Sequence, residues 1–176
     1  MIFQKTEIGG AYIIDAKKIE DQRGFFLNIW NKKEAQKNNL EVELTESNIA
    51  FNQKKGTIRG FHYQLPPYQG AKLIRCEKGS ILDITLDLRP NSETFKKWIS
   101  VELTESNYRM NYVPAGCGHA YQTLEDNTEV IYLMTQQYEP EFESGIQYSD
   151  PSFKINWPLE ITEISEKDKS WKLFSE

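Results

Sequence analysis

Long hydrophobic runs, cysteine-rich motifs and an excess of basic residues are all missing from this sequence. No stretch approaches the roughly 18 consecutive apolar residues of a membrane span, so we expect none. Residues 1–10 lack the apolar core of a secretory signal. Only two cysteines occur, Cys76 and Cys117, which excludes a disulfide framework and favours free thiols in the reducing cytoplasm. Acidic residues outnumber basic ones by 26 to 21, which disfavours a nucleic-acid-binding protein.

What is present is typical of one compact folded domain. The chain has 176 residues, of which 39% are hydrophobic, 12% aromatic and 27% charged, and this balance excludes intrinsic disorder. No repeat, low-complexity segment or Pro/Gly/Ser-rich linker divides it. We therefore expect a single domain over residues 1–176.

The hydrophobic pattern predicts many short strands and little helix. Residues 80–89 give the clearest signal, because four leucine or isoleucine residues alternate with Asp83, Thr85, Asp87 and Arg89, as in a half-buried strand. Further strands are predicted at 11–16, 25–30, 57–63, 71–76, 98–103, 108–113 and 128–136. Short helices are expected at 31–39, with Asn31 as the N-cap, and near 165–174. The sequence thus predicts an all-β sandwich or barrel with a few short flanking helices.

Histidine is scarce, so His62 and His119 are the first candidates for chemistry. For either histidine, a hydrogen-bonded packing role fits the sequence as well as a chemical role does. A metal site fits poorly, because histidine-rich sites need three or four donors with paired spacing and no such pair occurs. A general base is the more natural chemical role for a histidine at neutral pH.

The residues around His62 leave several interpretations open. Strict strand alternation would put Arg59 and His62 on opposite faces, but Gly60 between them is typical of a β-bulge that re-aims one side chain. Lys72 adds positive charge in the next predicted strand, although such charges are equally typical of a solvated surface. Tyr132 shares an apolar strand face with Val130 and Met134, which favours a core tyrosine with a locally satisfied hydroxyl.

The order and spacing of several motifs resemble those of the dTDP-4-dehydrorhamnose 3,5-epimerase family of cupins. The motifs are DQRGFF at 21–26, GTIRGFHYQ at 56–64, AKLIR at 71–75, DITLDLRPNS at 83–92, VPAGCGH at 113–119, EVIYLM at 129–134, DP at 150–151, NWP at 156–158 and ISEKD at 164–168. Each is weak alone, whereas together they cover most of the chain.

This resemblance implies a cupin jelly-roll β-barrel, usually a homodimer, with a site inside the barrel that uses no metal and no cofactor. It implies an isomerase whose substrate is a nucleotide-linked 4-keto-6-deoxy sugar. Its product would feed dTDP-L-rhamnose synthesis for cell-surface polysaccharide such as the lipopolysaccharide O antigen. No nucleic-acid or membrane partner is implied.

The same resemblance assigns roles to individual residues. His62 is the base, Asp168 orients it, Tyr132 is the acid on the opposite face and Lys72 stabilises the developing enolate. Arg59 and His119 face the diphosphate. The other positions expected to bind substrate are Arg23, Phe26, Asn28, Glu46, Asn48 and Tyr138.

The chain also departs from the family pattern. Asn28 stands where glutamate is usual, Glu46 where glutamine is usual, Ala50 where serine is common, and Ala120 replaces a glycine. The residues assigned to proton transfer are intact, so the departures bear on the nucleotide, the sugar and the carbon that reacts. The alternatives are therefore an epimerase acting only at C3 or only at C5, or a sugar-binding cupin without catalysis. A related ketoisomerase fits less well, because no strand carries paired histidines.

Overall fold

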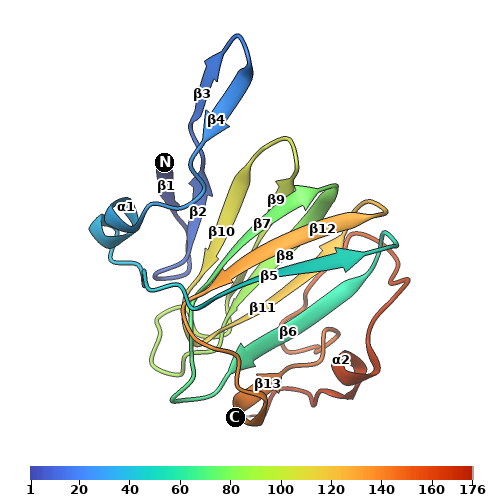
Figure 1. Ribbon diagram of the computed structural model, residues 1–176. Coiled ribbons are helices and arrows are strands. Elements are labelled where there is room, and N and C mark those ends of the chain that lie inside the picture. Colours follow the sequence, from blue (N-terminus) through green and yellow to red (C-terminus); the bar gives the residue numbers. More distant parts are fainter. Residues whose placement is uncertain (176) are drawn as a thin grey trace.

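Two antiparallel sheets face each other in a jelly-roll arrangement in the computed structural model, which describes residues 1–175 (Figure 1). The first sheet has the strand order β1 (Ile2–Lys5), β2 (Tyr12–Asp15), β10 (Arg109–Val113), β7 (Lys72–Lys78), β12 (Thr128–Met134) and β5 (Glu46–Asn52). The second has the order β13 (Glu143–Gly145), β6 (Ile58–Gln64), β11 (Cys117–Thr123), β8 (Ser80–Asp87) and β9 (Trp98–Thr104). The all-β prediction is confirmed.

Apolar side chains fill the space between the two sheets. Ile74 and Val130 of the first sheet pack with Ile81, Leu103 and Tyr121 of the second, all nearly inaccessible to water. Burial of this kind stabilises a fold by about 25 cal/mol for each Å² of apolar surface removed from water. The cluster occupies the inner part of the jelly roll and leaves the region around β6, β7, β11 and β12 for polar side chains.

Strand β8 corrects the prediction of a half-buried strand at residues 80–89. Ile84 and Leu86 alternate with polar residues, as predicted. The polar residues Asp83, Thr85 and Asp87, however, are buried as completely as Ile84 and Leu86. The apolar face is covered by Phe153 and its neighbours in the C-terminal segment. The polar face turns into the space between the sheets, where hydrogen bonds from other side chains satisfy it.

A two-stranded hairpin, β3 (Lys18–Asp21) with β4 (Gly24–Leu27), projects away from the sheets (Figure 1). The strand predicted at 25–30 therefore begins earlier and is shorter than expected. All of β3 is exposed, and Phe25 and Phe26 of β4 are exposed as well.

Both predicted helices are present. Helix α1 (Lys32–Lys37) begins after Asn31, whose side-chain oxygen accepts a hydrogen bond from the Glu34 amide at 3.1 Å. Helix α2 (Glu166–Ser170) is shorter than predicted, and the 3₁₀ turn η1 (Pro140–Phe142) precedes β13. Within residues 1–175, no helix is long and apolar enough to cross a membrane.

Candidate active site

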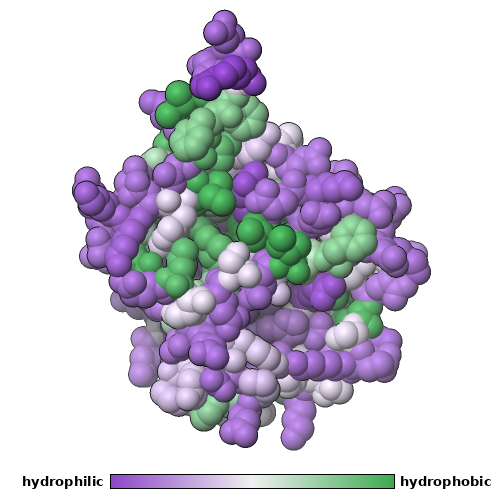
Figure 2. All heavy atoms as spheres, in the orientation of Figure 1, coloured by the Kyte–Doolittle hydropathy of each residue, from purple (hydrophilic) through white to green (hydrophobic). Residues whose placement is uncertain are grey.

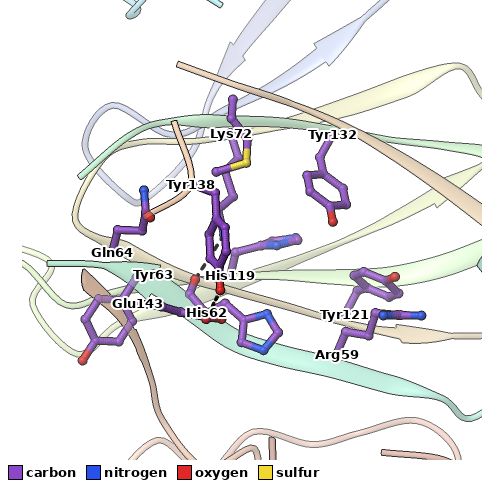
Figure 3. A pocket seen from close by; sticks show the side chains of 11 residues that line it. Arg59, His62, Tyr63, Gln64, Lys72, His119, Tyr121, Tyr132, Tyr138 and Glu143 are labelled. Carbon is purple, nitrogen blue, oxygen red and sulfur yellow. Dashed lines mark hydrogen bonds between the residues drawn. The ribbon is translucent and has the colours of Figure 1, made fainter. Parts of the chain in front are cut away.

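A pocket opens between the two sheets and is lined by side chains of strands β6, β7, β11 and β12 (Figure 3). Side chains from both sheets point into it, together with two from the segment that follows β12. The lining residues are Arg59, His62, Tyr63, Gln64, Lys72, His119, Tyr121, Tyr132, Met134, Tyr138 and Glu143. Six of the twelve predicted site residues line the pocket, namely Arg59, His62, Lys72, His119, Tyr132 and Tyr138.

His62, which lines this pocket, forms a hydrogen-bonded pair with Asp168. Nε2 of His62, on β6, lies 2.6 Å from Oδ1 of Asp168, on α2. The Asp168 side chain is 4% exposed and that of His62 is 30% exposed, so the ring faces the pocket and the carboxylate lies behind it. Burial alone would raise the pKa of Asp168, but its hydrogen bond with His62 and the amide of Gly60 hold it below its usual value. Asp168 is thus an anion that orients the imidazole.

A β-bulge at Gly60 brings Arg59 and His62 to the same pocket, as the sequence predicted. His62 lies opposite His119 and Arg59 lies opposite Tyr121, so two residues of β6 face the single residue between them on β11. Gly60 has φ +118°, and a Cβ there would lie 2.5 Å from the carbonyl oxygen of His119. Only glycine satisfies both conditions.

Lys72 enters the pocket from the opposite sheet. Its Nζ donates to the carbonyl oxygen of His62 at 3.3 Å. Burial lowers the pKa of Lys72 to about 8, while the negative charges of Asp83 and Glu143 act in the opposite direction. The ammonium group is therefore a cation, close to its titration point, that is held beside the base.

Tyr132 corrects the expectation of a purely core tyrosine. Its ring packs against the central apolar cluster, but its hydroxyl points into the pocket from β12 (Figure 3). Burial raises the pKa of Tyr132, an effect that the Glu46 charge reinforces and the Arg59 charge opposes. The phenol is consequently protonated at neutral pH and is available as a proton donor.

His119 forms a second histidine–aspartate pair in the same pocket. Its Nε2 lies 2.7 Å from Oδ2 of Asp83, and the other oxygen of Asp83 accepts from Nδ2 of Asn111 at 2.8 Å. His119 is 7% exposed and Asp83 is fully buried. The ring is fixed in place and turned toward the pocket space near Lys72.

Arg59 is held at the pocket by a side chain and a backbone carbonyl of β5. Its Nε donates to Oδ1 of Asn52 at 2.8 Å, and its Nη2 donates to the Phe51 carbonyl at 3.2 Å. Asn52 in turn contacts the Tyr121 hydroxyl. The guanidinium is thus oriented before any ligand arrives, which suits it to binding an anion.

Tyr138, Glu143 and Lys167 form a polar cluster at the pocket mouth. The Tyr138 hydroxyl donates to Oε2 of Glu143 at 2.5 Å, and Lys167 pairs with the same oxygen. Burial alone would raise the pKa of Glu143, but the hydrogen bonds from Lys167 and Tyr138 lower it. Glu143 is not predictable from the sequence, because it lies in an acidic segment that offers no periodic pattern.

Two predicted binding residues on β5 lie beside this cluster. Glu46 accepts from the Tyr138 amide at 2.7 Å and from Nδ2 of Asn48 at 3.3 Å. Asn48 lies opposite Tyr132 on the neighbouring strand. Glu46 therefore holds the backbone of the loop that carries Tyr138.

Three other predicted binding residues lie outside this pocket. Arg23 and Phe26 are on the projecting hairpin, where Arg23 pairs with Asp21 and Phe26 is 66% exposed. Asn28 follows β4, and its side chain accepts from the amide of Trp30 at 2.9 Å. Their role in binding remains a prediction.

No group of three or more histidine, cysteine or carboxylate side chains is arranged to hold a metal ion within residues 1–175. Both cysteines are buried and unpaired. Burial raises the pKa of each thiol to about 12, so neither is an activated nucleophile.

Comparison with known proteins matches this architecture to one family. The family model described as dTDP-4-dehydrorhamnose 3,5-epimerase matches residues 5–176. The enzyme of that name from Methanothermobacter thermautotrophicus is 40% identical, over 97% of this chain and 92% of its own length.

Solved structures agree. The dTDP-6-deoxy-D-glucose-3,5-epimerase of Legionella pneumophila, in complex with dTDP-4-keto-L-rhamnose, superposes with a TM-score of 0.91 at 33% identity, over 98% of this chain and 92% of that one. ChmJ, a 3′-monoepimerase from Streptomyces bikiniensis in complex with dTDP-quinovose, superposes with a TM-score of 0.88 at 28% identity. The superposition covers 96% of this chain and 85% of that one. The chain belongs to the dTDP-4-dehydrorhamnose 3,5-epimerase family of isomerases.

Proposed function

We propose that this protein epimerises dTDP-4-dehydro-6-deoxy-D-glucose at C3 and C5 to give dTDP-4-dehydro-L-rhamnose. One observation carries the proposal: His62 from one sheet and Tyr132 from the other point into the same pocket, with Lys72 beside them (Figure 3). Inverting a carbon next to a ketone needs a base on one face and an acid on the other, which is what two facing sheets supply.

The proton transfers follow from the hydrogen bonds of His62. Because Nε2 is bonded to Asp168, the neutral ring carries its proton there and leaves the lone pair of Nδ1 for the substrate. Nδ1 takes the proton from the carbon, the C–H electron pair moves into the enolate, and the Asp168 anion stabilises the imidazolium. Tyr132 then returns a proton to the opposite face of the carbon. Each positioned acid or base contributes about 10²–10⁴-fold in rate.

Lys72 stabilises the enolate oxygen that forms from the 4-keto group. Its ammonium group is partly withdrawn from water, so its charge acts more strongly than it would in solution. The Asp83 and Glu143 anions help to keep it protonated.

The nucleotide end of the substrate has its own set of residues. Arg59 and His119 bind the diphosphate, because both are fixed by hydrogen bonds and turned into the pocket. Tyr138 at the mouth, with Glu46 and Asn48 behind it, contacts the nucleoside.

A homodimer completes this binding site in our proposal. Apolar side chains are exposed on the hairpin and on the edge strand β5, including Ile19 at 64%, Phe26 at 66% and Ile49 at 69%. In Figure 2 apolar residues are visible on the hairpin and on the adjoining face of the first sheet. An apolar surface that links these elements suits a second copy of the chain, whose hairpin would bring Arg23, Phe26 and Asn28 to this pocket.

The reducing cytoplasm is the proposed location. Its support is the pair of buried, unpaired cysteines, together with a nucleotide-linked substrate.

Epimerisation at a single carbon is the second candidate. The likeness to the monoepimerase ChmJ supports it, since the two chains superpose with a TM-score of 0.88. One reaction separates the candidates: incubation of the dTDP-4-keto sugar with enzyme in D₂O, followed by proton NMR. Deuterium at both C3 and C5 supports the double epimerase, and deuterium at one carbon alone supports the single epimerase. Exchange at neither carbon would contradict both proposals for this substrate.

A further inference from the structure

Asp168, whose carboxylate orients His62, lies on a helix that is too short to be stable on its own. Helix α2 has only five residues, from Glu166 to Ser170, and helices shorter than about 12 residues are marginal on their own. Its N-cap, Ser165, accepts from the Asp168 amide at 3.0 Å, but this bond lies within the helix segment itself. The position of Asp168 relative to His62 must therefore be set by contacts between α2 and the sheet.

Trp171, the residue directly after α2, makes such a contact. Its indole lies against Gly145 of β13 so closely that a Cβ on Gly145 would be 2.5 Å from Nε1 and would also collide with Cε2. Gly145 is the cross-strand partner of His62. The indole is thus seated on the strand pair that carries the base.

Gly145 supplies space rather than an unusual backbone conformation. It is not among the glycines with positive φ, in contrast to Gly60, so other residues would be compatible with its backbone. What excludes a larger residue is the volume of the indole, together with the Phe61 carbonyl oxygen 2.6 Å from the same Cβ position. The glycine at 145 is therefore explained by the tryptophan at 171.

Contacts on both sides of Trp171 hold the indole in this place. Before it, Lys167 pairs with Glu143 at the start of β13. After it, the Lys172 carbonyl accepts from the Gln147 amide at 3.1 Å. Trp171 is not part of the pocket lining, and its Nε1 is buried without a hydrogen-bond partner. The indole N–H nevertheless lies near enough to the Asp168 carboxylate to help lower its pKa, so Trp171 acts on the site both through the elements it joins and directly on Asp168.

We propose that Trp171, seated on Gly145, is a positioning residue that fixes Asp168 of α2 against His62 of β6. This role rests on the proposed function for the meaning of the His62–Asp168 pair. It adds a requirement that the pair alone does not show: the dyad depends on a side chain that touches neither the substrate nor His62. Removing the indole takes away one of the contacts that fix α2, alongside the Gly60 amide on Asp168 and the Lys167–Glu143 pair, and lets the helix shift. A displacement of about 1 Å at a catalytic group can cost about 10²-fold in rate.

Two substitutions test this directly, one on each side of the contact. Trp171→Ala removes the indole that packs on Gly145, and Gly145→Ala fills the space that the indole occupies. We expect both variants to lower kcat by about 10²-fold with KM unchanged. Trp171→Phe keeps an aromatic ring on Gly145 but removes the indole N–H that acts on Asp168, so it should retain clearly more activity than Trp171→Ala. Leu173→Ala, at an exposed residue of the same segment, and Gly9→Ala, at a glycine with no neighbour within 4 Å, are the matched controls.

The pH profile distinguishes loss of orientation from general damage. When Asp168 moves away, the imidazolium loses its nearest negative charge, so the acid limb of kcat should shift to lower pH in Trp171→Ala. Glu143 and Lys72, which also face His62, are unchanged in that variant. A lower kcat with an unmoved acid limb, or a change confined to KM, would overturn the proposal. So would a Trp171→Phe variant as impaired as Trp171→Ala.

A measurement without substrate separates this proposal from the proposed function. Nitrogen-15 NMR of the histidine rings reports the Nε2–H···Oδ1 bond of His62 whether or not the enzyme turns over the dTDP sugar. We expect the His62 signal to change in Trp171→Ala and Gly145→Ala, and to stay as in the wild type in both controls. An unchanged signal in folded Trp171→Ala, with the same circular dichroism as the wild type, would contradict the positioning role even if catalysis proceeds as proposed.

Discussion

His62 and His119 lie opposite each other on β6 and β11, and each ring is hydrogen-bonded to its own aspartate. The two pairs differ in exposure: the His62 side chain is 30% exposed, whereas that of His119 is 8% exposed. Asp168 comes from helix α2 and Asp83 from strand β8 of the second sheet. The more accessible ring has the freedom to exchange protons with a substrate, and the enclosed ring is held as a fixed binding group.

The base assignment predicts a loss of turnover without a loss of nucleotide binding. His62→Asn removes the lone pair that takes the proton, so deuterium exchange at C3 and C5 should disappear. The affinity for dTDP, measured by calorimetry, should remain, because Arg59 and His119 are fixed by other contacts. Exchange at the wild-type rate in His62→Asn would show that another group is the base.

Asp168→Asn tests the orienting partner of that base. The amide lacks the charge that stabilises the imidazolium, so kcat should fall by about 10²-fold or more. The fold should survive, because asparagine is nearly the same size as aspartate. Measuring kcat and KM separately checks the prediction, and an effect on KM alone would contradict it.

The acid assignment of Tyr132 predicts a change in stereochemical outcome. In Tyr132→Phe the enolate still forms at His62, but no donor waits on the opposite face. Protonation then comes back from the imidazolium, so deuterium should enter the sugar with retention of configuration. Proton NMR distinguishes this exchange without inversion from true epimerisation. Inversion at the wild-type rate, or an effect confined to KM, would rule out Tyr132 as the acid.

Deprotonation of Lys72 should set the alkaline limit of activity. Burial lowers its pKa to about 8, and it must be protonated to stabilise the enolate, so kcat/KM of the free enzyme should fall as the pH rises through about 8. Tyr132 is not the source of this limb, because its pKa is raised, and the limb should persist in Tyr132→Phe.

The charges that face Lys72 allow the assignment to be checked. Asp83 on β8 and Glu143 on β13 both raise its pKa, against the effect of burial. Asp83→Asn removes one of these charges and should move the alkaline limb to lower pH. Asp87→Asn, at a buried carboxylate of the same strand that bonds instead to Arg89, Ser92 and Thr94, is the control. A limb that moves equally in both variants would point to a group other than Lys72.

Much of the fold could be predicted from residue alternation, and the missed strands show where this signal fails. Strand β11 has no alternation to read, because all seven of its residues are buried on both faces. In β5 the inward positions carry Glu46, Asn48 and Asn52, since they face the polar site rather than a core. A polar site between the two sheets is an exception to the usual rule that polar residues lie on the surface, and the same exception explains the buried Asp83 and Asp87 of β8.

The candidate site was less accessible to sequence reasoning. The bulge at Gly60 was predictable from one glycine within a strand pattern, and it correctly brings Arg59 and His62 together. The partnership of His62 with Asp168 was not, because the two residues are 106 positions apart and the helix that carries Asp168 is fixed by tertiary contacts. Only the resemblance to a known family suggested that pair.

The last prediction concerns the stability of the bulge itself. A Cβ at Gly60 would meet the carbonyl oxygen of His119 at 2.5 Å and the Cβ of Ala120 at 2.6 Å, with φ at +118°. Gly60→Ala therefore adds steric overlap to backbone strain and should lower the free energy of unfolding by about 3 kcal/mol or more. Gly24 has a similar φ of +125° but no neighbour within 4 Å, so Gly24→Ala carries the strain alone, about 1–2 kcal/mol. Urea unfolding of the two variants separates these contributions. If both variants lost the same free energy of unfolding, the strands β6 and β11 would be able to move apart at His119 with little loss of stability. The bulge would then not be what holds Arg59 and His62 on one side of the strand.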